Sequence, residues 1–255
     1  MAKRKSPSEL AMPLKKDYLA LPARKLLEEY GAGKHVPGSG SAAALSALIA
    51  VELITTVCKL TLKKTNYKHS HRKMEYIQSR IEKEFRPRLI DLFKQDIEAF
   101  NKVSVYRILR DRSDSPSEKR RLDAKSLKEQ KRATEIPMEI CTVSLELLPL
   151  ALAVFEEGYK SARGDSGVAV SNLLSAISGG MFIIFLNLKS FKKSRWLAQT
   201  KQNAEDLTRQ FYRYQARAFA KVLELYEEGL LDSDKQLRFP LPSLETGISE
   251  SAQPQ

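Results

Sequence analysis

Residues 34–41 read Lys-His-Val-Pro-Gly-Ser-Gly-Ser, and an apolar run over residues 42–62 follows them directly. The glycines Gly38 and Gly40 allow positive φ and let the backbone come close to a ligand. Ser41 is expected to be a helix N-cap, because its hydroxyl can accept a hydrogen bond from an early helical N–H. The free N–H groups of such a first turn form an anion site. The stretch therefore predicts either a ligand-binding loop or a loop that only starts a buried helix.

The helix expected from Ser41 to Lys64 is apolar on nearly every side of its first half, so it needs other helices around it. A second segment, Val168 to Leu188, is almost uncharged. About twenty apolar residues can span a membrane, but the recurring serines, glycines and asparagines of this segment favour a contact inside a bundle. No segment shows the period-two alternation of a half-buried strand. The chain is predicted to be all-α, an antiparallel bundle of long helices.

Other helix boundaries follow from capping residues and prolines. Ser115, Pro116 and Glu118 form a capping box with proline at the first helical position, which predicts a helix start. Asp165 is expected to cap the helix that follows it. A short helix is expected over Tyr18–Tyr30, with Leu19, Leu26 and Leu27 facing inward. Longer helices are expected over His69–Arg112, with a kink at Pro87, and from Pro116, with bends at Pro137 and Pro149. A last helix is expected over Arg195–Gly229.

The chain has 255 residues and a net charge of +12, which favours anionic partners. Residues 1–16 are expected to be a basic flexible arm, 17–230 one helical domain and 231–255 a disordered tail. The basic start runs into Ser-Pro-Ser rather than an apolar stretch, so no signal peptide is predicted and the expected compartment is the cytoplasm. Cys58 and Cys141 lie in apolar helical patterns and are expected to be buried thiols.

Two other candidate sites have simple interpretations. His69 and His71 lie two residues apart, on different helix faces, without further ligands at a suitable spacing, so no metal site is predicted. The stretch 107–132 is basic but mixed with acidic residues, which is typical of a solvated, ion-paired helix face. A nucleic-acid surface is the second interpretation of that stretch, and it is not favoured because aromatic residues are absent beyond Tyr106.

Four motifs resemble those of one family, in the same order. Pro37-Gly38-Ser39-Gly40-Ser41-Ala42-Ala43-Ala44 resembles the Pro-Gly-Gly-Gly-Ser-x-Ala-Ala signature of the formiminotetrahydrofolate cyclodeaminase and methenyltetrahydrofolate cyclohydrolase family. Asp96-Ile97-Glu98-Ala99-Phe100 is similar to its Asp-x-x-Ala-Phe, Gly164-Asp165-Ser166-Gly167-Val168-Ala169 to its Ser-Asp-x-x-Val-Ala, and Phe185-Leu186-Asn187-Leu188 to its Ile-Asn-Leu. The charged helix from Pro116 to Pro137 has a counterpart there too. The resemblance covers roughly residues 18–228.

The resemblance implies a helical homodimer with a folate site at the subunit interface. Members add water to the methenyl bridge of tetrahydrofolate, acting as hydrolases, or release ammonia from its formimino group, acting as lyases. The expected ligand is a folate-type small molecule, without a metal or redox cofactor and without a membrane.

The same resemblance assigns the site residues. The substrate-binding set is Pro37, Gly38, Ser39, Gly40, Ser41, Lys63 and Asn187, and the catalytic set is Asp165, Asp96 and Lys64. The methenyl group is cationic, so a carboxylate beside it stabilises charge or deprotonates the attacking water. A lysine could bind the glutamate tail of folate or polarise the formyl oxygen. Taken alone, both aspartates and both lysines also suit ordinary cap and surface positions.

This sequence departs from the family pattern at four positions. Ser39 replaces the central loop glycine, Lys63 replaces the glycine before a basic cluster, Thr65 takes a basic position, and Ile183 stands where some members have asparagine. The competing hypothesis is therefore a catalytically inactive bundle on the same scaffold that binds an anionic ligand, a nucleic acid or a protein.

Overall fold

The computed structural model describes residues 16–232, with side chains to residue 229. The predicted arm and tail lie almost wholly outside these residues. Every regular element in the described part is helical, which confirms the all-α prediction. The chain divides into two compact units, residues 1–218 and 219–255. The first unit holds the bundle, and the described part of the second is the last stretch of the final helix.

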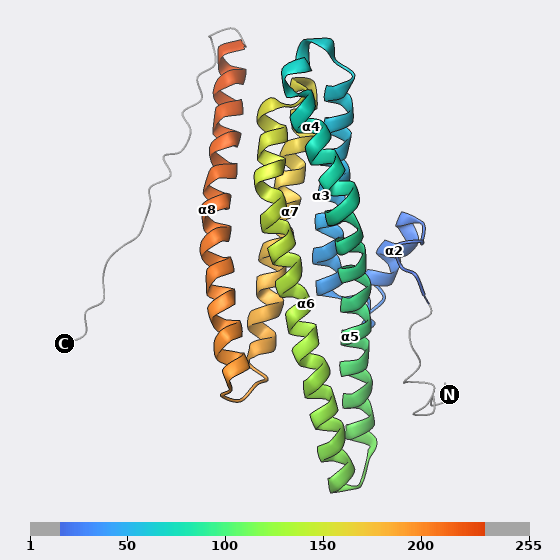
Figure 1. Cartoon of the computed structure of the whole chain (residues 1–255). Helices are drawn as coiled ribbons and strands as arrows, with labels where there is room; N and C mark the ends of the chain where they lie inside the picture. Colours follow the sequence, from blue (N-terminus) through green and yellow to red (C-terminus); the bar gives the residue numbers. More distant parts are fainter. Residues whose placement is uncertain (1–15, 233–255) are drawn as a thin grey trace, which may run out of the picture. The chain divides into compact units, whose positions relative to one another are not determined.

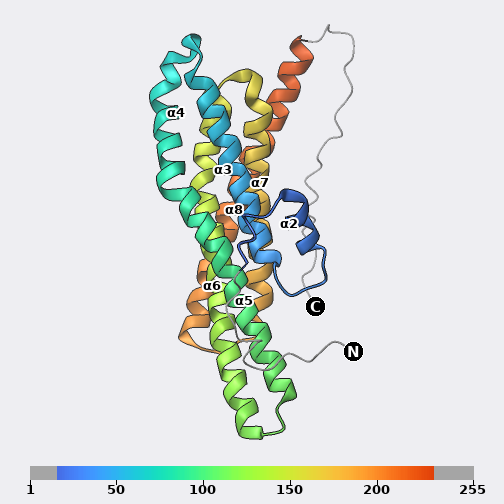
Figure 2. The same cartoon turned by 90° about the vertical axis from the view of Figure 1, so that its right-hand side faces the viewer.

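Four long helices form the body of the first unit, and neighbours in sequence run antiparallel (Figures 1 and 2). They are α3 (Ser39–Leu62), α5 (Arg86–Arg112), α6 (Pro116–Glu157) and α7 (Arg163–Leu188). The shorter elements are α2 (Ala23–Tyr30), the 3₁₀ turn Thr65–Tyr67, α4 (Lys68–Arg80), the π turn Ile81–Phe85 and the 3₁₀ turn Lys160–Ala162, and α8 (Arg195–Asp232) ends the described chain.

Helix α3 is the centre of the core, as its composition predicts. Ala44, Ala47 and Ala50 are fully buried, and their small side chains let neighbouring helices come close. The carboxyl end of α3 is tied to the segment before α7 by Tyr159, whose backbone N–H donates to Thr61 Oγ1 at 2.9 Å. The start of α3 packs near the end of α7, where a Cβ on Gly179 would lie 3.8 Å from Ala43 Cβ. Helices α3 and α7 are therefore antiparallel neighbours.

The kink predicted at Pro87 corresponds to an irregularity just before it, a π turn that ends two residues ahead of the proline. The helical pattern of residues 69–112 breaks into α4, a π turn over Ile81–Phe85, and α5, with Pro87 in the first turn of α5. Proline lacks an N–H, so the first turn is the position it tolerates best. The predicted cap of α6 is confirmed, since Ser115 Oγ accepts from the Glu118 N–H at 3.4 Å.

Several local predictions are wrong. Helix α2 begins at Ala23 rather than Tyr18, because Pro22 holds an extended conformation before it, and Leu27 is 68% exposed. Ser41 and Asp165 are not N-caps: the caps are Gly38 and Ala162, and each predicted residue lies at the third helical position. At Asp165 the reason is the 3₁₀ turn before α7, which leads the chain into the helix three residues earlier than predicted.

Within the described part of the chain, three segments are long and apolar enough to cross a membrane by length and composition, namely Ser39–Leu62, Pro116–Glu157 and Lys160–Leu188. In the first two, 61% of the apolar window is buried inside the structure, as in a core helix. In the third the share is 39%, so α7 keeps an uncovered apolar face.

Candidate functional site

A cavity of about 210 Å³ lies where the start of α3 meets α5, α6 and the end of α7. Its lining comes from all four helices: Gly38, Ser39 and Gly40 at the start of α3, Asp96 and Phe100 from α5, Ala133 from α6, and Ile183, Leu186 and Asn187 from α7. Five of the predicted site residues meet here, although up to 149 positions separate them in sequence. Two of the four departures from the family pattern, Ser39 and Ile183, line the same cavity.

Asp96 is the ionisable side chain of this cavity. It is 6% exposed, and its Oδ2 accepts from the backbone N–H of Ser41 at 2.7 Å. Burial raises the pKa of Asp96 to about 6, and the Ser41 donor opposes that rise. A carboxylate at the N-terminus of a helix is also favoured by the helix dipole. Asp96 is therefore charged at neutral pH and can still accept a proton close to that pH.

Gly40 is required by the position of Asp96. A Cβ on Gly40 would lie 2.0 Å from Asp96 Oδ1, which is far inside van der Waals contact. The loop glycines were expected to supply positive φ, and this expectation is wrong. Gly38 has a φ of −129° and Gly40 lies inside α3, whereas among residues 16–232 the glycine with positive φ is Gly33, at 66°. Gly40 is needed for close approach instead.

Ser41 stabilises the loop through hydrogen bonds and does not line the cavity. It is fully buried; its Oγ accepts from the Gly38 N–H at 3.1 Å and donates to the Gly38 carbonyl at 2.9 Å. Tyr30 Oη also donates to Ser41 Oγ, at 3.2 Å. Pro37, preceded by a cis peptide bond from Val36, is buried just outside the cavity lining. Ser41 and Pro37 shape the loop and are not exposed to a ligand.

Asn187 enters the cavity from α7. Its Nδ2 donates to the carbonyl of Ala133 at 3.0 Å, which fixes the side chain between α7 and α6. Its Oδ1 therefore remains as a hydrogen-bond acceptor for a ligand.

The other predicted residues lie at the opposite end of the bundle. Lys63 caps α3 and Lys64 follows it, with its Nζ 4.8 Å from the ring centre of Tyr159. Asp165 lies in the first turn of α7. At a helical rise of about 1.5 Å per residue, Asp165 is about 33 Å from Asn187 along α7. Within one chain, the predicted site therefore forms two separate groups.

Sequence reasoning missed four residues of the cavity region. Tyr30, Phe100, Ala133 and Leu186 were not among the predicted site residues. Phe100 could have been predicted from the sequence, because it lies four residues after Asp96 and therefore on the same helix face. Tyr30 had none, since its approach to Ser41 depends on how α2 folds back on the bundle.

The chain is similar in sequence to proteins that act on folates. The family model described as formiminotransferase-cyclodeaminase matches residues 22–206. Methenyltetrahydrofolate cyclohydrolase from Methylorubrum extorquens is 29% identical over 171 residues, covering 67% of this chain and 81% of that protein. Formimidoyltransferase-cyclodeaminase from Sus scrofa is 24% identical over 189 residues, covering 73% of this chain but only 34% of that protein.

A solved structure has the same fold. The crystal structure of formiminotetrahydrofolate cyclodeaminase from Thermotoga maritima matches with a TM-score of 0.69 at 22% identity. The match covers 82% of this chain and 100% of that chain. The antiparallel bundle is thus an architecture seen by experiment.

Proposed function

Since the match over residues 22–206 shows that the chain belongs to the formiminotransferase-cyclodeaminase family, we propose that it is a folate one-carbon enzyme that hydrolyses the methenyl bridge of 5,10-methenyltetrahydrofolate. The observation that carries the proposal is the buried Asp96 carboxylate beside the cavity at the start of α3. The relative of which this chain covers 81% is named a methenyltetrahydrofolate cyclohydrolase.

The reaction adds water to a cationic carbon between two nitrogens. In our proposal Asp96 faces that cation, stabilises its charge, and accepts one proton as the water oxygen bonds to the carbon. One carbon–nitrogen bond of the bridge then breaks: the departing nitrogen takes the remaining proton of the added water as the carbonyl forms, which leaves a formyl group on the other nitrogen. No electrons are exchanged and the carbon is already electrophilic, so we expect the step to need no metal or redox cofactor. We expect it to take place in the cytoplasm.

The other cavity groups suit the flat, polar ring system of a folate. Phe100, Ile183 and Leu186 offer apolar contacts, and Asn187 Oδ1 can accept from a ring N–H. The loop of Gly38 and Ser39 allows the ligand close to the backbone. Ser39 and Ile183 change the surface of this cavity without removing Asp96 or Asn187.

The second candidate reaction is release of ammonia from 5-formiminotetrahydrofolate. It is supported by the similarity to the pig formimidoyltransferase-cyclodeaminase, of which this chain spans 34%. The same carboxylate would serve, because closure of the bridge passes through a cationic carbon of the same kind.

The test is a pair of assays on purified protein. Decay of the methenyltetrahydrofolate absorbance measures hydrolysis, and ammonia release from the formimino substrate measures deamination. We expect the first rate to rise well above buffer. Faster turnover of the formimino substrate would favour deamination, and activity on neither would reject both reactions in favour of the ligand-binding hypothesis.

We further propose that the enzyme is a homodimer formed through α7. Val168, Phe182 and Leu186 are 53%, 73% and 61% exposed, and Phe185 is exposed on the same side. Exposed serines, Ser171 and Ser175, lie between them and leave room for close contact. An uncovered apolar face of this kind marks an interaction site.

A twofold dimer would also unite the two groups of predicted residues. If α7 pairs antiparallel with its copy, the Asn187 end of one subunit lies against the Asp165 end of the other. Asp165 and Lys64 of the partner subunit would then approach the cavity that holds Asp96. This arrangement accounts for a family resemblance that spans both ends of the bundle.

Two measurements test the dimer. Light scattering should give twice the chain mass for the wild type and the mass of one chain for Phe182→Asp. Because the Phe182 side chain is exposed, its replacement should leave the fold of the single chain intact. Mixing Asp96→Asn with Asp165→Asn, after unfolding and refolding together, should restore about a quarter of wild-type activity, because half the dimers then hold one intact site of two. A mixture no more active than the average of the two variants would contradict a shared site.

A further inference from the structure

The hydroxyl of Tyr30 lies at the end of a chain of contacts that reaches Asp96. Tyr30 Oη donates to Ser41 Oγ at 3.2 Å, and the N–H of Ser41 donates to Asp96 Oδ2 at 2.7 Å. Both remaining positions on Ser41 Oγ are used by Gly38. A hydroxyl has one donor and two acceptor sites, so the Ser41 side chain is fully satisfied only when Tyr30 is present.

The tyrosine is held as a donor. Burial raises the pKa of Tyr30; the bond to Ser41 opposes this rise, and the negative charge of Asp96 adds to it. The phenol therefore keeps its proton throughout the neutral range. Since Tyr30 comes from α2 and Ser41 from α3, this bond ties the segment before the loop to the first turn of α3.

We propose that Tyr30 is a positioning residue for Asp96: by fixing the Ser41 side chain, it keeps the Ser41 N–H directed at the carboxylate that faces the substrate. Tyr30 lies outside the cavity lining. Its effect passes through the backbone N–H that donates to Asp96.

The surroundings of Asp96 make that donor decisive. The side chains that share its cavity are all uncharged, from Ser39 on α3, Phe100 on α5, Ala133 on α6, and Ile183, Leu186 and Asn187 on α7. Among the described groups, burial and the Ser41 N–H are what set the proton affinity of Asp96, and Tyr30 on α2 is the titratable group coupled to it. If the hydrogen bond from the Ser41 N–H weakens, less opposes the rise that burial causes in the pKa of Asp96.

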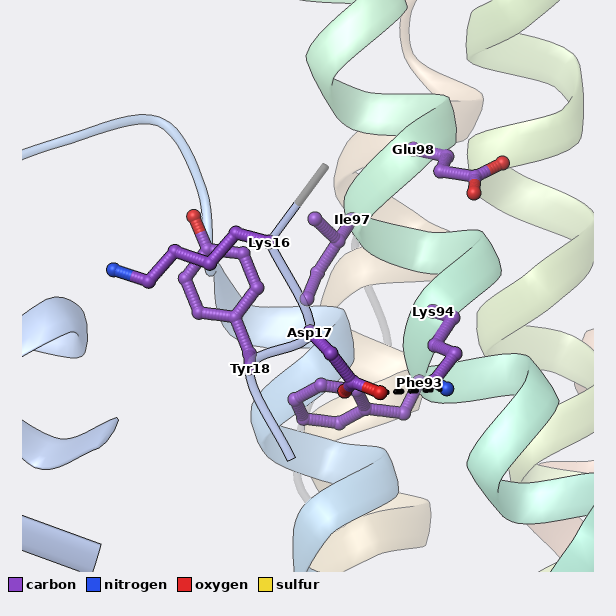
Figure 3. A pocket seen from close by; sticks show the side chains of 7 residues that line it. All are labelled: Lys16, Asp17, Tyr18, Phe93, Lys94, Ile97 and Glu98. Atoms are coloured by element: carbon purple, nitrogen blue, oxygen red, sulfur yellow. Dashed lines mark hydrogen bonds and ion pairs between the residues drawn. The ribbon is translucent and has the colours of Figure 1, made fainter. Parts of the chain in front are cut away.

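The segment before α2 supplies a matched control. Figure 3 shows Asp17 and Tyr18 against Phe93, Lys94 and Ile97 of α5, around a second cavity of about 180 Å³. Asp17 Oδ2 accepts from Lys94 Nζ at 3.0 Å, and Tyr18 is 5% exposed. Tyr18 is thus a buried tyrosine of the same part of the chain, and it lines this second cavity, whose lining does not include Ser41.

The experiment compares Tyr30→Phe with Tyr18→Phe, each of which removes one hydroxyl. We expect Tyr30→Phe to lower kcat about three- to tenfold, the value of one hydrogen bond, with KM little changed. The acid limb of its pH–rate profile should move to higher pH, because the carboxylate loses part of its donor. Tyr18→Phe should leave kcat and the acid limb unchanged. Ser41→Ala should resemble Tyr30→Phe, and combining the two should add little.

The kinetic readout rests on the proposed function, so a second readout is independent of it. NMR titration of carboxyl-labelled aspartates measures the pKa of Asp96 in the resting protein, with Asp96→Asn assigning the signal. An upward shift in Tyr30→Phe but not in Tyr18→Phe supports the proposal even if no folate is turned over. Equal Asp96 titration in wild type and Tyr30→Phe overturns it, whatever the activity.

Discussion

The two ends of the bundle hold residues assigned by the same family resemblance, but they differ in physical character. At the start of α3, a buried carboxylate, a glycine that cannot be replaced and a fixed asparagine surround one cavity. At the far end, Lys63 is exposed, Lys64 lies over an aromatic ring, and Asp165 sits in a first helical turn. The first group can surround a ligand within a single chain. The second group could reach that ligand only across a dimer.

The largest difference in stability should appear between two variants, each of which adds one methyl group, one variant at either end of the bundle. Gly40→Ala places a Cβ 2.0 Å from Asp96 Oδ1, so either the carboxylate or the first turn of α3 must move. We expect a loss of about 3 kcal/mol in the free energy of unfolding, together with loss of activity. Gly164→Ala, in the first turn of α7, meets nothing within 4 Å and should raise stability by about 0.5 kcal/mol. Denaturant unfolding of both variants measures the contrast, and equal values would contradict it.

A smaller effect is expected in the pH dependence of stability. Burial raises the pKa of Asp96 to about 6, above its ordinary value of 3.8, so the folded state binds more protons than the unfolded state between these values. The carboxylate should therefore destabilise the wild type progressively as pH rises from 4 to 6, by about 2 kcal/mol in all. Asp96→Asn removes this contribution and keeps an acceptor for Ser41.

The variant should accordingly be more stable than the wild type at pH 7, and its advantage should shrink at pH 4. Urea unfolding at the two pH values gives the comparison. A difference between the two proteins that is the same at both values would show that Asp96 has no raised pKa.

At the far end, Asp165→Asn should reduce kcat/KM about tenfold, or about 1.4 kcal/mol, by removing one charge from the partner's side of the site. The loss should appear when Asp165→Asn is made in the dimer. In a Phe182→Asp background, in which the subunits are already separated, the same change should cause no further loss of activity. Steady-state kinetics of the single and double variants measure this. Full activity of Asp165→Asn would restrict the site to the cavity end.

The smallest effect is expected for Lys64→Met. It removes a contact between a cation and the Tyr159 ring and should lower stability by about 0.5 kcal/mol. Lys63→Met, at the neighbouring exposed position, is the control and should be neutral. Thermal unfolding distinguishes the two, and equal melting temperatures would remove Lys64 from the packing of this end.

The sequence predicted the helices better than their relation in space. The apolar α3 and the cap at Ser115 follow from local rules, and both are present. The grouping of site residues does not follow from such rules, because it depends on which helix ends meet. Antiparallel packing brings Asn187 to Gly40 and carries Asp165 away from both, and no spacing along the chain reveals that.

The role of Gly40 shows the same limit. Glycine in a loop suggests a free backbone dihedral, but here it lies inside a helix and is needed because Asp96, 56 positions later, occupies the place of a side chain. Tyr30 went unnoticed for the same reason. Its hydroxyl has a role only after α2 has folded against the start of α3.

The most direct measurement is the initial rate of methenyltetrahydrofolate decay with wild type, Asp96→Asn and Asp165→Asn at pH 7. With Asp96 as the base facing the cation, Asp96→Asn should lose about a hundredfold or more in kcat/KM while remaining folded. Asp165→Asn should lose less. An Asp96→Asn enzyme that hydrolyses the substrate at the wild-type rate would contradict the assignment of the site to the start of α3.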